Sequence, residues 1–199
     1  MANEHEIRIG PAGWSYTDWE RIVYPSPRPH DFHEPAYLAQ FFDTIEINTS
    51  FYYPMKATLA KQWLGRVSTN PRFLFTAKLW QKFTHEGNPS KADEAAVREG
   101  FDVLNAAGKL GAVLLQFPFS FHRTPENVKR LEAIFEAFCM YPLAVEIRHS
   151  SWSSKEFYED LHHRRVGLCN IDQPLIGRSV KPGSVATLSL IHISEPTRP

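Results

Sequence analysis

The sequence predicts an α/β fold in which parallel strands form an incomplete (β/α) barrel, with about six of eight strand–helix units present. Three observations predict it. Strand-like and helix-like segments alternate along the chain, as in parallel sheets with right-handed crossovers. The segments 44–50 and 144–150 alternate aliphatic residues with charged or amide ones. Polar or aromatic clusters follow the strands, as expected where the loops of a barrel gather at one face.

The individual elements follow from short β-branched or aliphatic runs and from apolar residues at helical spacing. Ser90 is predicted to cap a long helix, and Thr124 precedes Pro125 at a favourable first helical position. Ser153 and Glu156 are predicted to form a capping box that opens a helix to about residue 165. The predicted strands are 7–10, 44–48, 73–78, 112–116, 144–148 and 166–172, and shorter helices are expected at 18–23, 36–42 and 59–67.

Polar side chains are predicted to point into the barrel from the strand ends. Neighbouring strand residues face opposite sides, so Ile45 and Ile47 oppose Glu46, and Val145 opposes Glu146. Such strands are covered on both faces, and a carboxylate in an interior needs partners. By the same alternation Cys169 is expected to face the helices. The predicted inward set is Glu46, Asn48, Lys78, Gln116, Glu146, Arg148, Asn170 and Asp172.

These side chains suggest acid–base chemistry on a polar ligand. Two carboxylates can divide acid and base roles when their environments differ, and lysine and arginine can hold an anion. Aromatic side chains at the rim can stack on a sugar or a base. The predicted catalytic residues are Glu46, Lys78, Glu146 and Asp172. The predicted ligand-binding residues are Trp14, Tyr16, Asn48, Tyr52, Gln116, Arg148, His149 and Trp152, with Phe51 also at the rim.

The simplest alternative is that Glu46–Lys78 and Glu146–Arg148 are buried ion pairs that neutralise one another. Lys78 as a Schiff-base lysine is disfavoured, because neighbouring carboxylates raise a lysine pKa. Glu146, His149 and Asp172 do not follow a known metal-binding spacing, so no metal site is predicted. The sequence identifies no cofactor. An open doubly wound sheet is the alternative fold, but the sequence lacks the glycine fingerprint of a dinucleotide site.

Composition narrows the class of protein. The formal net charge is +0 and the isoelectric point is about 7.1, so no global basic field indicates nucleic acid. Cys139 and Cys169 form no C-x-x-C pair, which indicates a reducing compartment and argues against structural zinc or a disulfide framework. The first residues lack the apolar stretch of a signal peptide, and no apolar run is long enough to span a membrane. A soluble cytoplasmic protein without a membrane partner is expected.

Several motifs together resemble one known family. The matching pieces are Gly13-Trp14-Ser15-Tyr16 with Trp19 and Tyr24-Pro25, Phe42 to Asn48 with Phe51-Tyr52, Phe75-Thr76-Ala77-Lys78, Leu115-Gln116-Phe117-Pro118, and Val145 to His149 with Trp152. In their joint occurrence the chain resembles the domain of unknown function 72 family, the YecE-like proteins. The resemblance implies a TIM-type barrel, and it implies no settled activity for the family.

The C-terminal segment departs from this family resemblance. Family members continue with two more strand–helix units, whereas residues 188–199 resemble a translated sequencing adapter. We therefore expect a partial barrel domain over 1–187 and a non-native tail over 188–199. The usual barrel phosphate site, which the loops after strands seven and eight build, would then be missing.

The leading functional hypothesis is a protein that binds or transforms a small polar ligand, anionic or sugar-like, at the carboxyl ends of the strands. The sequence leaves open whether it is an enzyme. One alternative is a nucleic-acid-binding or repair-like barrel, which the neutral net charge disfavours. The other is a non-catalytic ligand-binding module with the same ring of residues.

Overall fold

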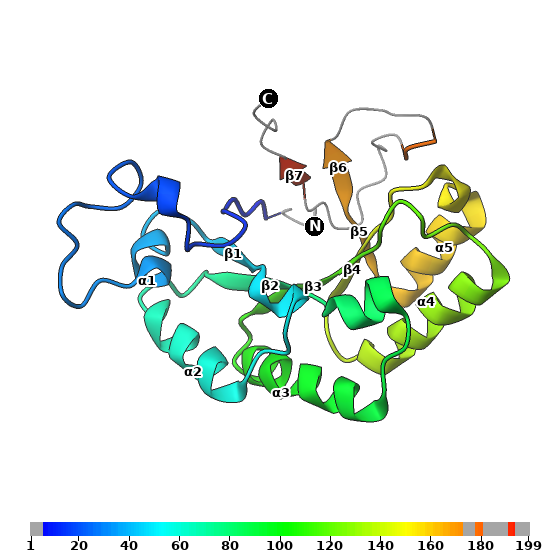
Figure 1. The fold of residues 1–199 in the computed structure, drawn as a ribbon, viewed down its shortest axis with the longest axis horizontal. Helices are drawn as coiled ribbons and strands as arrows, with labels where there is room; N and C mark the ends of the chain where they lie inside the picture. The colour runs from blue at the N-terminus through cyan, green and yellow to red at the C-terminus, as the bar shows by residue number, and fades with distance from the viewer. Residues whose placement is uncertain (1–5, 173–177, 181–190, 194–199) are drawn as a thin grey trace, which may run out of the picture. The chain divides into compact units, whose positions relative to one another are not determined.

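A computed structural model of the chain describes residues 6–172, 178–180 and 191–193 (Figure 1). It is an α/β fold with a five-stranded parallel sheet in the order β1-β2-β3-β4-β5, and β6 pairs in parallel with β7. The strands are β1 Thr44–Ile47, β2 Leu74–Lys78, β3 Leu110–Gln116, β4 Leu143–Glu146, β5 Gly167–Leu168, β6 Asn170–Asp172 and β7 Ile191–Ile193. The predicted α/β class is confirmed, and the barrel stays a prediction.

Five α-helices and four shorter helices connect the described strands. The α-helices are α1 Glu34–Leu38, α2 Ala57–Arg66, α3 Lys91–Ala106, α4 Pro125–Phe138 and α5 Lys155–Arg164. The shorter ones are η1 Thr17–Trp19, η2 Thr49–Phe51, the π-helix η3 Lys82–Glu86, and η4 Ser150–Trp152. The chain forms two compact units, residues 1–78 with 95–111 and residues 79–94 with 112–199.

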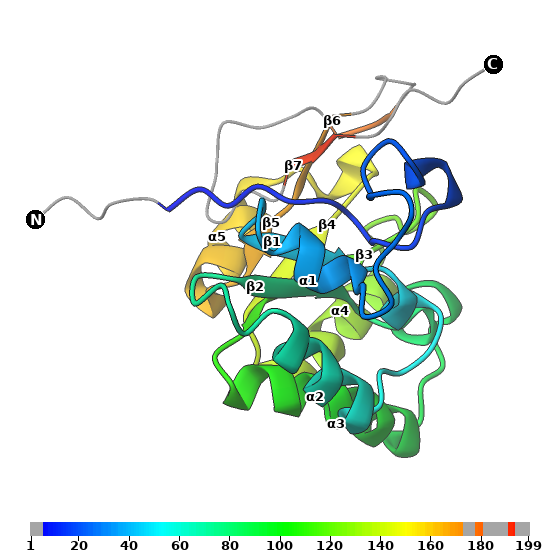
Figure 2. The same ribbon diagram turned by 90° about the vertical axis from the view of Figure 1, so that its left-hand side faces the viewer.

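In the first unit, β1 and β2 pair in parallel with Glu46 opposite Thr76. Helix α2 packs on β2 through Trp63, whose ring centroid lies 6.4 Å from that of Phe75 (Figure 2). Ile45 and Glu46 point to opposite faces of β1, and both are buried. Both faces of this strand are therefore covered, and the glutamate is held inside the unit as the alternation predicts.

In the second unit, β3 and β4 pair in parallel with Gln116 opposite Glu146, and β4 pairs in turn with β5. Helices α4 and α5 lie side by side next to these strands (Figure 1), and the Arg164 guanidinium sits 5.6 Å from the ring centroid of Phe135. All four residues of β4 are buried. The carboxylate of Glu146 is therefore enclosed at the carboxyl end of its strand.

The capping residues of three helices can be compared with those that the sequence predicts. Ser90 and Asp93 bond reciprocally at the start of α3, and Thr124 accepts the Asn127 N–H at the start of α4, as predicted. The predicted cap of α5 is one residue wrong. Ser154, not Ser153, accepts the N–H of the third helical residue, because Ser153 already caps the C-terminal end of the preceding short helix η4.

The strand predicted at 7–10 is absent, since Ile7 and Ile9 are exposed and the described chain there has no strand pairing. The pairing shifts to Ala12, which forms an isolated bridge with Glu46. Gly10 explains the shift, because a Cβ there would lie 1.7 Å from the carbonyl oxygen of Thr44. The chain approaches β1 too closely for an ordinary strand residue, and it pairs only after the proline that follows.

The strand predicted over 166–172 is divided in two. β5 continues the five-stranded sheet, whereas β6 leaves it to pair with β7. Cys169 packs with Ala112, Leu114 and Ala144, on the face that also carries Glu146, so its predicted helix-facing orientation is wrong. The orientation of Cys169 is set by the register in which β5 pairs with β4, and not by the polarity of the residues that follow Cys169. β7 lies within 188–199, and the non-native origin of that segment stays a prediction.

Candidate functional site

Three predicted site residues meet at the carboxyl ends of β3 and β4. Arg148 donates Nε and Nη2 to Oε1 of Glu146, at 2.9 and 2.8 Å. The Gln116 amide donates to both oxygens of the same carboxylate, at 2.9 and 2.8 Å. The Glu146 side chain is 1% exposed and the Arg148 side chain is 38% exposed. The buried carboxylate therefore fixes two side chains whose outer ends reach the surface.

His149 lies beside this cluster in a defined tautomer. Its Nδ1 accepts the backbone N–H of Ser151 at 3.2 Å, and the Ser151 hydroxyl lies 2.8 Å from the same nitrogen. Because the backbone N–H can only donate, Nδ1 carries no proton, and neutral His149 is protonated on Nε2. The ring of His122 lies 4.0 Å away by centroids. His149 thus presents an N–H donor in a surrounding of aromatic rings.

Two histidines near the cluster are affected by burial and by neighbouring cations. Desolvation, the neighbouring His122 and Arg178 lower the pKa of His149. Desolvation, Arg130 and Arg148 lower the pKa of His85 as well, and Glu146 opposes them only as the last contribution. Both imidazoles are therefore disfavoured as cations, mainly because they are desolvated and in addition because cations lie near them.

The first unit holds a second group of predicted residues. Lys78 Nζ lies 3.5 Å from Oε1 of Glu46, with side-chain exposures of 17% and 7%. The Ser50 hydroxyl can donate to either of two backbone carbonyls, that of Lys78 at 2.7 Å or that of Ile47 at 2.8 Å. The helix η2, which follows β1, is thus tied to the end of β2. Both predicted ion pairs, here and at Glu146, are present.

Asn48 carries an acceptor that the described protein does not use. Tyr16 donates its hydroxyl to the Ala12 carbonyl, so that hydroxyl can only accept from the Asn48 amide, 3.4 Å away. This bond orients Nδ2 towards Tyr16 and Oδ1 away from it. Oδ1 is buried and has no hydrogen-bond partner among the described residues. A buried acceptor of this kind is satisfied by a bound donor, either ligand or water.

The predicted aromatic rim divides into core and surface residues. Trp152 is 1% exposed, stacks on Phe121 at 5.1 Å and donates its indole N–H to the Phe121 carbonyl. Trp14 packs edge-on against Trp63 of α2, at 5.0 Å. Tyr52 and Tyr16 are exposed. Trp152 is thus a core residue, whereas Trp14 and Phe51 are half-buried and the two tyrosines are exposed.

Asp172 lies in β6, and its side chain falls outside what the structure describes. Its predicted catalytic role stays a prediction. Across the described part of the chain, no group of three histidine, cysteine or acidic side chains is placed to bind a metal ion. None of the helices in that part is both long and apolar enough to cross a membrane.

Sequence reasoning missed His85, His122 and Arg130. His85 and His122 lie in the segments after β2 and β3, where barrel loops carry function, so their position alone could have marked them. Arg130 lies within α4, among residues chosen for their helical spacing. Nothing in the sequence distinguishes it from an ordinary surface arginine, because its proximity to His85 arises only from tertiary packing.

The comparison with known proteins decides the family. Residues 8–193 match the family described as protein of unknown function DUF72. The chain belongs to the DUF72 family. A curated relative, the UPF0759 protein YunF of Bacillus subtilis (strain 168), is 31% identical over 161 residues, which cover 77% of this chain and 54% of that protein. The chain thus spans about half the length of this curated relative.

Solved DUF72 structures share the fold. A DUF72 family protein from Thermotoga maritima MSB8 superposes with a TM-score of 0.74 at 30% identity, covering 92% of this chain and 71% of that one. One from Enterococcus faecalis V583 gives a TM-score of 0.68 at 25% identity, covering 77% and 64%. None of these names states an activity, so the ligand has to be argued from the residues of this chain.

Proposed function

We propose that this DUF72 chain binds a small polar ligand with an anionic group at the carboxyl ends of β3 and β4. The observation that carries the proposal is the fork of Arg148. Glu146 takes Nε and Nη2 of the guanidinium, and no described residue bonds to Nη1. A guanidinium fixed in this way loses little entropy when its remaining donors bind an anion.

The neighbouring residues support the same class of ligand. Gln116 and His149 offer an amide and an imidazole N–H beside Arg148, which suit the hydroxyl groups of a sugar. Desolvation is the main cause of the lowered pKa of His149 and His85, and the cations that add to it, Arg178, Arg130 and Arg148, favour a negative group over a neutral one. Sugar phosphates combine both features and are the ligand class that we propose.

In this proposal Glu146 is a positioning residue. Its two oxygens already accept bonds from Gln116 and Arg148, and its side chain is almost fully enclosed. A carboxylate in that state is poorly placed to exchange a proton with a ligand. We propose ligand binding as the function and leave catalysis by Glu46, Lys78 or Asp172 as a prediction from the sequence.

Calorimetric titration with glucose 6-phosphate, glucose and inorganic phosphate tests the proposal. We expect glucose 6-phosphate to bind more tightly than either fragment. Arg148→Ala should weaken it about ten- to hundredfold, since charged hydrogen bonds contribute about 1.5–3 kcal/mol, and Arg148→Lys should weaken it less. Arg164→Gln is the matched control, because Arg164 pairs with Asp160 on α5.

Equal affinity of the wild type and both Arg148 variants would overturn the proposal. Tighter binding of a single-stranded oligonucleotide, with affinity falling steeply between 50 and 200 mM salt, would favour the nucleic-acid alternative instead. Both measurements use the same protein and buffer series, so the two classes of ligand are compared directly.

A further inference from the structure

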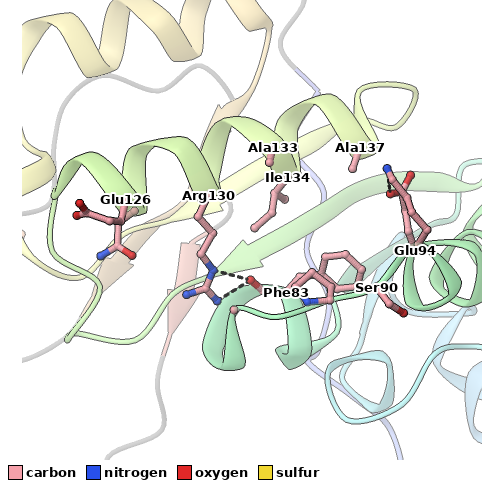
Figure 3. A pocket seen from close by; sticks show the side chains of 12 residues that line it. Phe83, Ser90, Glu94, Glu126, Arg130, Ala133, Ile134 and Ala137 are labelled. Carbon is pink, nitrogen blue, oxygen red and sulfur yellow. Dashed lines mark hydrogen bonds and ion pairs between the residues drawn. The ribbon is translucent and has the colours of Figure 1, made fainter.

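A cavity lies on the helical side of the second unit, and neither Gln116 nor Glu146 lines it. It has a volume of about 490 Å³ and runs between α4 and the segment 83–94 (Figure 3). We call it the α4 groove. Its size falls within the range of small-molecule sites, about 300–1,000 Å³. Its apolar lining comes from Phe83, Pro89, Ala133, Ile134 and Ala137.

Arg130 is the polar centre of the α4 groove. It donates Nε and Nη2 to the Phe83 carbonyl at 3.1 and 2.6 Å, as Figure 3 shows. Its guanidinium also packs on Gly87, where a Cβ would come within 2.9 Å of its atoms. These contacts fix the guanidinium and leave Nη1 without a hydrogen-bond partner among the described residues.

Among the described residues, Arg130 lacks the carboxylate partner that each of two neighbouring lysines has. Lys82 pairs with Asp93 at 2.9 Å, and Lys91 pairs with Glu94 at 2.8 Å. Across the described residues, Arg130 pairs with no carboxylate. Desolvation lowers its pKa, so a bound anion would restore part of the stabilisation that water no longer provides.

The remaining acid of the groove faces elsewhere. Glu126 accepts hydrogen bonds from its own backbone N–H and from Thr124 at the start of α4, and these lower its pKa. In Figure 3 it lies at the opposite end of the groove from Ala137, with its carboxylate directed away from Arg130. The apolar half beyond Arg130 therefore contains no carboxylate that would repel an anionic ligand except Glu94, which is paired with Lys91.

We propose that the α4 groove binds a small amphipathic carboxylate, with its anionic group on Arg130 and its apolar chain along Ala133, Ile134 and Ala137. Ala137 lies seven positions after Arg130 in α4, which at 1.5 Å per residue gives an apolar path of about 10 Å. That length fits a medium-chain acid. This site uses none of the residues proposed to contact the ligand at Arg148, although Arg130 and Arg148 both act on the pKa of His85.

Titration with octanoate, followed by amide chemical shifts, tests this site, with octanol and acetate as the neutral and tail-less probes. We expect octanoate to shift amides of α4 and of residues 83–94, and to bind about tenfold or more tightly than either probe. Arg130→Gln should weaken octanoate about tenfold, and Lys129→Gln, which removes an exposed cation of the same helix, should not.

A second variant keeps the test valid if the loss of the Phe83 bond disturbs the fold. Ala133→Trp adds bulk to the apolar half while Arg130 and its Phe83 bond are kept, and it should block octanoate, whereas Lys129→Trp adds the same bulk outside the groove and should not. The proposal is overturned if octanoate does not bind at millimolar concentration. It is also overturned if octanol binds equally well, or if both groove variants bind octanoate like the wild type.

Discussion

Arg148 gives two donors to Oε1 of Glu146, and the Gln116 amide donates to both oxygens of the same carboxylate. This arrangement follows from the parallel register, which places Gln116 directly opposite Glu146 at the ends of β3 and β4. The arginine follows two residues later in the same chain and reaches the carboxylate from the loop side. One buried acid thus orders two side chains from adjacent strands.

Replacing Glu146 by glutamine should destabilise the protein. The glutamine keeps one acceptor oxygen, but its NH2 group would face the amide NH2 of Gln116, and the negative charge that pairs with Arg148 is lost. Removing one partner of a buried pair costs about 3–5 kcal/mol, but the exposure of Arg148 reduces this, so we expect about 1–3 kcal/mol in urea unfolding. As a control, Glu159→Gln breaks only the exposed Lys155–Glu159 pair. A Glu146→Gln value no larger than the control value would contradict the positioning role.

Gly87 should tolerate alanine poorly. Its φ is +82°, and a Cβ would meet the Arg130 guanidinium at 2.9 Å. We expect Gly87→Ala to cost about 2–3 kcal/mol, of which backbone strain accounts for about 1–2. Gly108 also has a positive φ, of +64°, but has open space around it, so Gly108→Ala isolates the strain. Thermal unfolding of the two variants compares them, and equal losses would mean that Arg130 does not pack on Gly87.

Stability should fall on mild acidification because of His149. Its pKa is lowered in the folded protein, mainly by desolvation, so the unfolded chain binds the proton first. The free energy of unfolding therefore begins to decrease as the pH falls below about 6.5, and the decrease ends below the pKa of His149 in the folded protein. His149→Asn, which retains an acceptor for the Ser151 N–H, should reduce this dependence. Unfolding midpoints between pH 8 and 5 measure it, and an unchanged slope in the variant would exclude His149 as its source.

The sequence predicts the placement of the two glutamates well because the physics behind it is local. Alternation along a covered parallel strand sets which face Glu46 and Glu146 occupy, and both are buried next to a cation. The same alternation fails for Cys169. There the strand breaks after two residues, and pairing with β4, which is non-local, decides the orientation.

Contacts between helices and loops lie beyond the reach of sequence patterns. The bond from Arg130 to the Phe83 carbonyl joins residues 47 positions apart, and no spacing rule connects them. The burial of Trp152 is similar, since an aromatic residue after a strand is equally typical of a rim and of a core. The pattern identifies where polar chemistry gathers, whereas tertiary packing decides which of these side chains a ligand can reach.

Substitution by alanine should affect stability and ligand binding differently at Asn48 and at Asn70. Asn70 donates to the carbonyls of Ala39 and Phe42 and to Asp43, at 2.9 to 3.3 Å, so Asn70→Ala should cost about 1–3 kcal/mol in urea unfolding. Asn48 makes one long bond and leaves a buried acceptor unused, so Asn48→Ala should cost less than about 1 kcal/mol. If that acceptor binds a ligand, Asn48→Ala should weaken ligand binding while Asn70→Ala should not. A loss of stability in Asn48→Ala as large as in Asn70→Ala would show that the oxygen serves the fold.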